Sequence, residues 1–231
     1  MGSGQAGVAA PGAILPVSAA TDPAAVFTAV AGEEPLVAVV RTMLARIGAA
    51  RVVVAVPERL VATAHGLLAA RGWSAVAVVA APAPGDRHQA IGAGLKYLAP
   101  EPDSAAPLLV FDHRHPLVPT EVTDRVIAGL RAGHRIVVPV LPVTDSVKSV
   151  DGCGTVVETI DRATLRSVQY PRGFTASTLT ELLALDSSED EVRAAHTAGL
   201  PLTAVDGHRD AVRFALPADA ELLAAIIESR R

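Results

Sequence analysis

The chain has 231 residues and a formal net charge of −4; half of its residues are hydrophobic, yet only 3% are aromatic. A single domain of this length buries a sizeable core, which must here consist of Ala, Val, Leu and Ile, a mixture typical of buried parallel strands covered by helices. The acidic balance gives no reason to expect nucleic-acid binding, no apolar run reaches the ~18 residues that span a bilayer, and the single cysteine, Cys153, excludes an internal disulfide.

The first residues, 1–11, have neither the charged region nor the apolar region of a secretory signal. We interpret them as a flexible leader that precedes a single domain over residues 12–231. We therefore expect a cytoplasmic protein that does not bind membranes.

Apolar runs typical of strands alternate with stretches of helical period, which predicts βαβ units. We expect strands at residues 12–17, 51–56, 75–79, 108–111, 135–140 and 202–205. Helices are expected at 36–47, 58–71, 86–98, from 119 to a stop at Gly133, from Thr175 onward and at 217–229. Residues 186–198 form a polar segment, and 211–215 an extended piece. The pattern predicts an α/β fold with a mainly parallel sheet and helices on both faces.

Two features of this pattern stand apart. Gly92 and Gly94 weaken the helical prediction for residues 86–98. Asp151-Gly152 is a tight-turn dipeptide between valine-rich stretches, so residues 144–172 are expected to form a projecting arm with a β-hairpin.

Ligands of open α/β sheets bind outside the carboxyl ends of the strands, where the strand order switches. Four segments fall at such positions and are the candidates for a site. They are residues 17–21, 83–88, 112–116 and 144–148.

These segments contain, in order, motifs that resemble the 2-C-methylerythritol 4-phosphate cytidylyltransferase family. Residues 110–116, V-F-D-H-R-H-P, are similar to that family's V-H-D-A-A-R-P, and residues 139–148 to its P-V-x-D-T-x-K. Asp161-Arg162 with residues 170–174 resemble its D-R…T-P-Q-x-F, and residues 206–213 its E-G-x-x-x-N-[IF]-K. The resemblance extends from Ala13 to Ile227.

The resemblance implies a Rossmann-like nucleotidyltransferase fold and transfer of CMP from CTP to a polyol phosphate with Mg²⁺. The implied nucleotide contacts are Pro16, Val17, Ser18, Gly85, Arg87 and Asp112. The implied polyol phosphate contacts are Asp145, Ser146, Lys148, Arg162 and Arg213, and the Mg²⁺ ligands are Asp112 and Asp210. It also implies a two-fold homodimer that exchanges the arm, with Arg162 reaching into the partner's site.

The first loop departs from the family pattern. The family's P-A-A-G-x-G-x-R…P-K wraps the triphosphate with glycine amides and two cations, whereas residues 16–27 contain no Gly, Arg or Lys and include Asp22. Gln89, Ala90 and His115 replace an Asp, a Ser and an Arg of other motifs, and the family's T-D-[DE]-A run has no counterpart in residues 186–198. We therefore expect transfer from CTP to be impaired or lost. An active nucleotidyltransferase with an altered substrate, and a non-catalytic interaction protein, remain as alternatives.

Single residues also have more ordinary interpretations. Asp112 could be a helix cap or turn former. His113 and His115 would share one face of an extended segment, but zinc would need a third ligand, so we expect surface or pocket histidines. Cys153 is expected as an exposed thiol at the hairpin tip.

Overall fold

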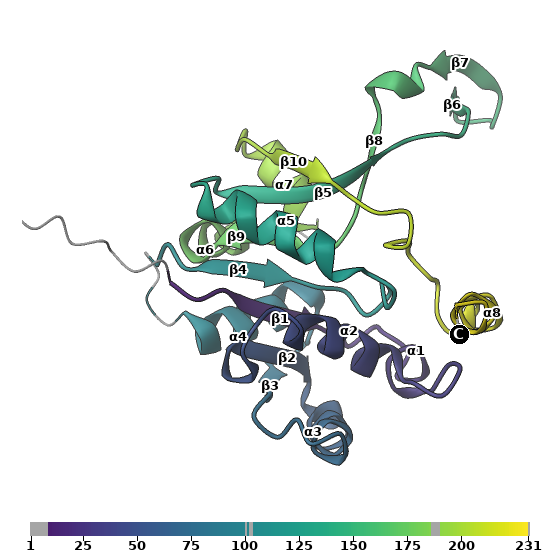
Figure 1. Cartoon of the computed structure of the whole chain (residues 1–231). Coiled ribbons are helices and arrows are strands. Elements are labelled where there is room, and N and C mark those ends of the chain that lie inside the picture. Colours follow the sequence, from purple (N-terminus) through teal and green to yellow (C-terminus); the bar gives the residue numbers. More distant parts are fainter. Residues whose placement is uncertain (1–8, 100, 102–103, 186–189, 231) are drawn as a thin grey trace, which may run out of the picture.

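The computed structural model describes residues 9–99, 101, 104–185 and 190–230. Its central sheet has eight strands, in the order β10-β5-β9-β4-β1-β2-β3, with β8 paired to β5 (Figure 1). The strands are β1 Gly12–Pro16, β2 Val52–Pro57, β3 Ala77–Ala81, β4 Pro107–Val110, β5 Ile136–Pro142, β8 Arg166–Val168, β9 Arg172–Thr175 and β10 Thr203–Asp206.

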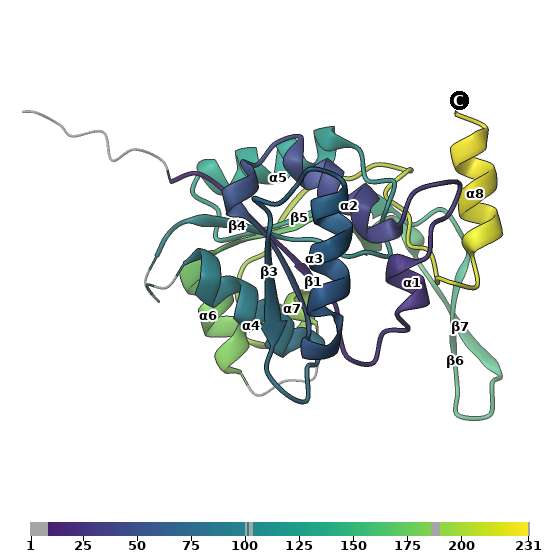
Figure 2. The ribbon, with the colours of Figure 1, turned by 90° about the horizontal axis from the view of Figure 1, so that it is seen from below.

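Helices α2, α3 and α5 cover one face of the sheet and α4, α6 and α7 the other, whereas α8 lies apart from the sheet (Figure 2). The bounds of the α-helices are α1 Ala24–Phe27, α2 Pro35–Leu44, α3 Val61–Ala70, α4 Arg87–Leu98, α5 Thr120–Arg131, α6 Ala176–Ala184, α7 Glu191–Thr197 and α8 Ala220–Glu228. Apolar side chains of α2, α3 and α5 pack in one core cluster, and those of α4, α6 and α7 in the other. The predicted α/β class is confirmed.

The central strands of the sheet are parallel and fully buried. β1, β2 and β4 are buried along their whole length, and β1 pairs in parallel with both β2 and β4. Strands without a solvent face have no place for alternating polar residues, so they consist of Val, Leu, Ile, Ala and similar residues. β2 with β3 and β5 with β10 are parallel as well.

The strand β9 was not predicted. It lies antiparallel between β4 and β5, which places β4 and β5 in the same direction. The carboxyl ends of β1, β4 and β5 therefore meet at one edge of the sheet, as expected. Val17 and Asp112 follow two of these ends, and Asp145 lies three residues beyond the third, where the arm begins.

Other predictions needed correction in detail. β3 begins two residues later than expected, residues 211–215 form no strand, and the segment after Asp190 is the helix α7. Residues 186–189 of the polar segment and residues 1–8 of the expected leader lie outside the described residues, so the division at residue 11 stays a prediction. None of the described helices is long and apolar enough to cross a membrane.

The predicted hairpin is present and leads away from the sheet (Figure 1). It pairs β6, Val147–Val150, with β7, Val156–Ile160, in antiparallel register. Its connection spans residues 151–155, where the Asp151 carboxylate accepts the N–H groups of Cys153 and Thr155 at 2.9 Å each. Cys153 is exposed there, as expected.

Candidate functional site

Asp112 lies just beyond β4 at the carboxyl edge of the sheet and is almost completely buried. Arg114 holds its carboxylate: Nε donates to Oδ1 at 2.9 Å and Nη2 to Oδ2 at 2.5 Å. Burial raises the pKa of the Asp112 carboxyl, but the hydrogen bonds from Arg114 and the charge of Arg87 outweigh it and hold this pKa well below its ordinary value. Asp112 is thus an ionised acceptor whose partners come from its own chain.

The turn after Asp112 corrects the prediction for the two histidines. The His115 N–H donates to the Asp112 carbonyl at 3.0 Å, and the Arg114 N–H to Asp112 Oδ1 at 2.9 Å, so Asp112 also acts as a turn former. The segment is therefore not extended. Both rings are buried, and burial lowers the pKa of His113 to about 4 and lowers that of His115. His115 hydrogen-bonds the Ala211 carbonyl through Nδ1 at 3.1 Å.

Arg87 connects Asp112 to α7. Its Nε donates to Glu191 at 2.9 Å, its Nη2 to the Tyr170 hydroxyl at 3.1 Å, and its Nη1 lies 3.5 Å from Asp112 Oδ2. Glu191 also accepts from Arg172 at 3.0 Å, and the Arg172 guanidinium stacks over the Tyr170 ring at 4.3 Å. Burial raises the pKa of Tyr170 to about 12, so its hydroxyl stays protonated.

The charges of this cluster balance. Three guanidinium groups, those of Arg87, Arg114 and Arg172, face three carboxylates, those of Asp112, Asp190 and Glu191. Each cation is paired inside the protein, so little positive charge is left to attract an anionic ligand.

The first loop follows β1, and its backbone donors are used internally. The N–H of Val17 bonds the Ala55 carbonyl at 2.8 Å, and that of Ala19 bonds the Gly85 carbonyl at 2.6 Å. The N–H groups of Ala20 and Thr21 bond Ser18, at 3.3 and 3.0 Å. A loop that cradles phosphate needs successive amides aimed outward, and these four point to protein acceptors instead.

The second predicted loop is closed by Gln89. Its Oε1 accepts the N–H groups of Gly85 and Asp86, at 2.6 and 3.1 Å, while Asp86 caps α4 by accepting the Gln89 N–H at 2.8 Å. This reciprocal capping box fixes the turn and occupies its amides. Gly85 has φ of +77°, a conformation that favours glycine.

The predicted polyol phosphate contacts lie apart from this cluster. Asp145, Ser146, Lys148 and Arg162 are exposed on the arm, which projects from the body (Figure 1). Lys148 Nζ bonds the Thr159 hydroxyl at 2.7 Å, and Arg162 bonds the Thr144 carbonyl. Arg213 is exposed near the carboxyl-terminal part of the chain. Within one chain, then, the structure joins Arg87 to Asp112 and the first loop to the Gly85 turn through Ala19, but leaves the arm residues outside.

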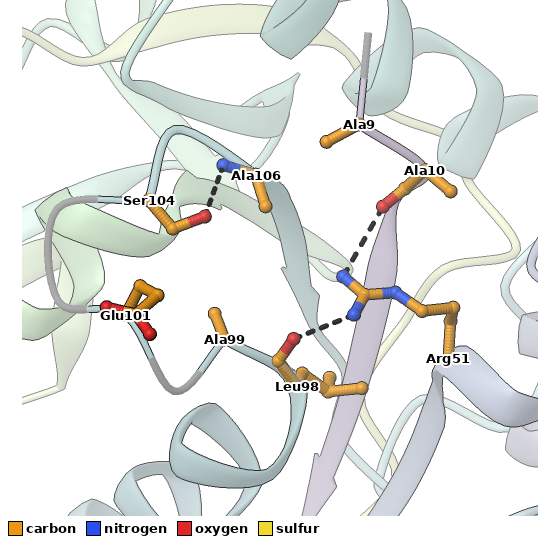
Figure 3. Close-up of a pocket in the computed structure, with 8 residues that line it drawn as sticks. All are labelled: Ala9, Ala10, Arg51, Leu98, Ala99, Glu101, Ser104 and Ala106. Atoms are coloured by element: carbon orange, nitrogen blue, oxygen red, sulfur yellow. Dashed lines mark hydrogen bonds between the residues drawn. The ribbon is translucent and has the colours of Figure 1, made fainter. Parts of the chain in front are cut away.

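Two of the cavities in the described part of the chain lie at opposite edges of the sheet. One, of about 710 Å³, lies at the carboxyl ends of β2 and β3 beside Gln89 and Lys96. The other, of about 340 Å³, lies at the amino ends, where Arg51 donates to the carbonyls of Leu98 and Ala10 (Figure 3). Ligands of such sheets bind at the carboxyl edge. Of these two cavities, the one beside Gln89 lies at that edge and adjoins the second predicted loop.

Comparison with known proteins decides the family. The sequence model of 2-C-methyl-D-erythritol 4-phosphate cytidylyltransferase matches residues 13–229. The chain belongs to this family. The family enzyme of Nocardia farcinica is 39% identical over 181 residues, which are 78% of this chain and 75% of that protein. That of Streptomyces coelicolor is 33% identical over 212 residues, 88% of this chain and 77% of the relative.

Solved cytidylyltransferase structures share the fold. The enzyme of Thermus thermophilus superposes with a TM-score of 0.72 at 23% identity, over 95% of this chain and 99% of that one. The 4-diphosphocytidyl-2C-methyl-D-erythritol synthase of Anaerococcus prevotii gives a TM-score of 0.78 at 18% identity, over 95% and 96%.

A divalent cation, which the cytidylyltransferase family uses, does not fit the residues as they lie. Both Asp112 oxygens accept from arginines, and Asp210 pairs with Arg230 at 3.0 Å. Over residues 9–99, 101, 104–185 and 190–230, no three His, Cys, Asp or Glu side chains gather as a metal site. The histidine pair likewise lacks a third zinc ligand there.

Sequence reasoning missed four residues of this region: Arg59, Arg114, Arg172 and Glu191. Arg59 follows β2, and its Nη2 donates to the Ala19 carbonyl of the first loop at 3.1 Å. Asp190 followed by Glu191 is a helix-start signal that was readable in the sequence. The pairing of Glu191 with Arg87, 104 residues away, was not.

Proposed function

We propose that this family member keeps the cytidylyltransferase fold but has largely or wholly lost transfer of CMP from CTP to 2-C-methyl-D-erythritol 4-phosphate. The first loop carries the proposal. It contributes no cation, because the first basic residue of the chain is Arg41, and four of its N–H groups bond protein acceptors. A bound triphosphate brings about four negative charges, whose burial without partners is strongly unfavourable.

The rest of the pocket does not compensate for this loss. Arg87, Arg114 and Arg172 are matched by Asp112, Asp190 and Glu191, and Asp22 adds negative charge to the first loop. Stabilisation of the transition state by oriented hydrogen-bond donors is commonly the largest contribution to enzymatic rate enhancement. A pocket without free donors for the phosphates therefore lacks this contribution.

The test is pyrophosphate release from CTP and 2-C-methyl-D-erythritol 4-phosphate with Mg²⁺, against an intact family member. We expect turnover at least ~10⁴-fold lower, because two missing donors cost about 10²–10³ each. A variant with a glycine-rich, Arg- and Lys-bearing loop between Pro16 and Phe27 should bind CTP more tightly. Release at ordinary enzymatic rates, about 1 s⁻¹ or more, would contradict the proposal.

One observation favours a second candidate, an active nucleotidyltransferase with another substrate. Arg59 contacts the Ala19 carbonyl and so brings a cation against the first loop from the turn after β2. A thermal-shift screen of nucleotides and polyol phosphates, with and without Mg²⁺, separates the candidates, since a ligand at 100 times its Kd stabilises by about 2.7 kcal/mol. A shift by a nucleotide other than CTP, lost in Arg59→Ala, would favour the second candidate.

We further propose that the arm, residues 144–172, pairs two chains as a two-fold homodimer. Val150, Val156 and Val157 of the hairpin are each more than half exposed in the single chain, which favours burial against a partner. The exchange would bring Arg162 and Lys148 to the partner's site. A cytoplasmic location stays a prediction.

A further inference from the structure

The Asp112 carboxylate has no acceptor position left. An ionised carboxylate offers about four lone-pair sites. Oδ1 accepts from the backbone N–H and Nε of Arg114, each at 2.9 Å, and Oδ2 accepts from Arg114 Nη2 at 2.5 Å and Arg87 Nη1 at 3.5 Å. The four donors fill these positions with two arginines of the same chain.

Arg114 is also the outer member of the pair. Its side chain is 34% exposed, whereas that of Asp112 is 1% exposed. A Mg²⁺ ion must approach a carboxylate oxygen to about 2.0–2.1 Å. Here it would have to displace a bidentate guanidinium, the strongest geometry for an arginine on a carboxylate.

The family motif quoted above makes this a particular feature of the chain. Where the family has alanine two residues after its aspartate, this sequence has Arg114. The replacement of this alanine by Arg114 therefore places a positive charge on the Asp112 carboxylate, which the family resemblance assigns to Mg²⁺.

We propose that the Arg114 guanidinium takes the place of a divalent cation at Asp112, so that the chain holds no divalent ion there. The proposal concerns the site of the proposed function and rests on it for the position of that site. Any nucleotide bound at this edge is then held without a metal, and Arg114 is the residue that sets this specificity.

The test is titration of the full chain with Mn²⁺ alone, followed by the paramagnetic resonance of the free ion. Wild type should show no site that depends on Asp112. Arg114→Ala should gain one Mn²⁺ site per chain, at least about ten-fold tighter than any wild-type site, since a unit charge within hydrogen-bond distance is removed. The double variant with Asp112→Asn should lose it again. Arg114→Gln, whose shorter side chain keeps a hydrogen-bond donor without the charge, serves if the alanine variant does not fold.

Arg135→Ala is the matched control. It removes an arginine from another carboxylate pair, with Glu181 at 2.6 Å, on the surface, and should create no Mn²⁺ site. An Asp112-dependent Mn²⁺ site in wild type would overturn the proposal, as would folded Arg114 variants that gain none. Pyrophosphate release distinguishes the two proposals. Release in EDTA would defeat the loss of activity but not this inference. Release that requires Mg²⁺, together with a wild-type Mn²⁺ site that is lost in Asp112→Asn, would defeat both.

Discussion

Glu191 shows how much depends on single buried charges. Its side chain is 5% exposed and accepts from both Arg87 and Arg172. Glu191→Gln should reduce the free energy of unfolding by about 3 kcal/mol, because the buried guanidinium of Arg172 and the partly buried one of Arg87 each lose a buried counter-charge. Glu181→Gln is the control: its pair with Arg135 is about half exposed and should cost no more than about 1 kcal/mol. Urea unfolding measures both, and equal losses would contradict the buried role of Glu191.

Burial of His113 predicts how stability depends on pH. Its pKa is lowered from 6.5 to about 4, so between these values the unfolded chain binds a proton that the folded chain does not. Stability is therefore full above pH 6.5 and falls as the pH drops toward 4, by at most about 1.4 kcal/mol per pH unit for this proton. His113→Asn should flatten that slope in urea unfolding from about pH 7 to 4.5. An unchanged slope would show that His113 is not the titrating group.

The helix α4 provides a matched pair of glycines. A Cβ on Gly94 would lie 2.6 Å from Ile14 Cγ2 of β1, whereas one on Gly92 would meet nothing nearer than 4.0 Å. Gly94→Ala should destabilise by about 1–3 kcal/mol through overpacking. Gly92→Ala should stabilise by up to about 1 kcal/mol, because alanine is the better helix former. Thermal unfolding decides, and two changes of the same sign would refute the close packing of α4 on β1.

The strand β9 explains why the sheet was only partly predictable. Arg172–Thr175 is short and includes Gly173, so it carries no strand pattern. Its glycine is needed because a Cβ there would lie 2.5 Å from Val126 on α5. What holds such a strand is its pairing with β4 and β5 on either side.

The arm leads to a prediction about how whole chains associate. Val157 is 62% exposed, so Val157→Lys should leave the stability of the single chain nearly unchanged while placing a charge in the proposed interface. Sedimentation at micromolar concentration should show dimers for wild type and a shift toward monomers for the variant. Val212→Lys, at an exposed site outside the arm, is the control. A monomeric wild type would defeat the proposed dimer.

Local patterns in the chain were enough to predict the α/β class, the strands β1, β2, β4 and β5, the hairpin and the family. Each of these depends on neighbouring residues: valine-rich runs, glycine stops and ordered motifs. The lack of cations in the first loop could likewise be read directly. The edge that gathers Val17 and Asp112 followed from the rule for parallel strands.

The contacts of those residues within the chain, in contrast, became visible only in the folded structure. Asp112 was predicted as a metal ligand, but Arg114 and Arg87 saturate its oxygens, and Gln89 occupies the amides of the Gly85 turn. These outcomes depend on side-chain direction and on contacts between distant elements. Arg87 meets Glu191 across 104 positions, a pairing that no local pattern encodes because it depends on how α7 packs relative to α4.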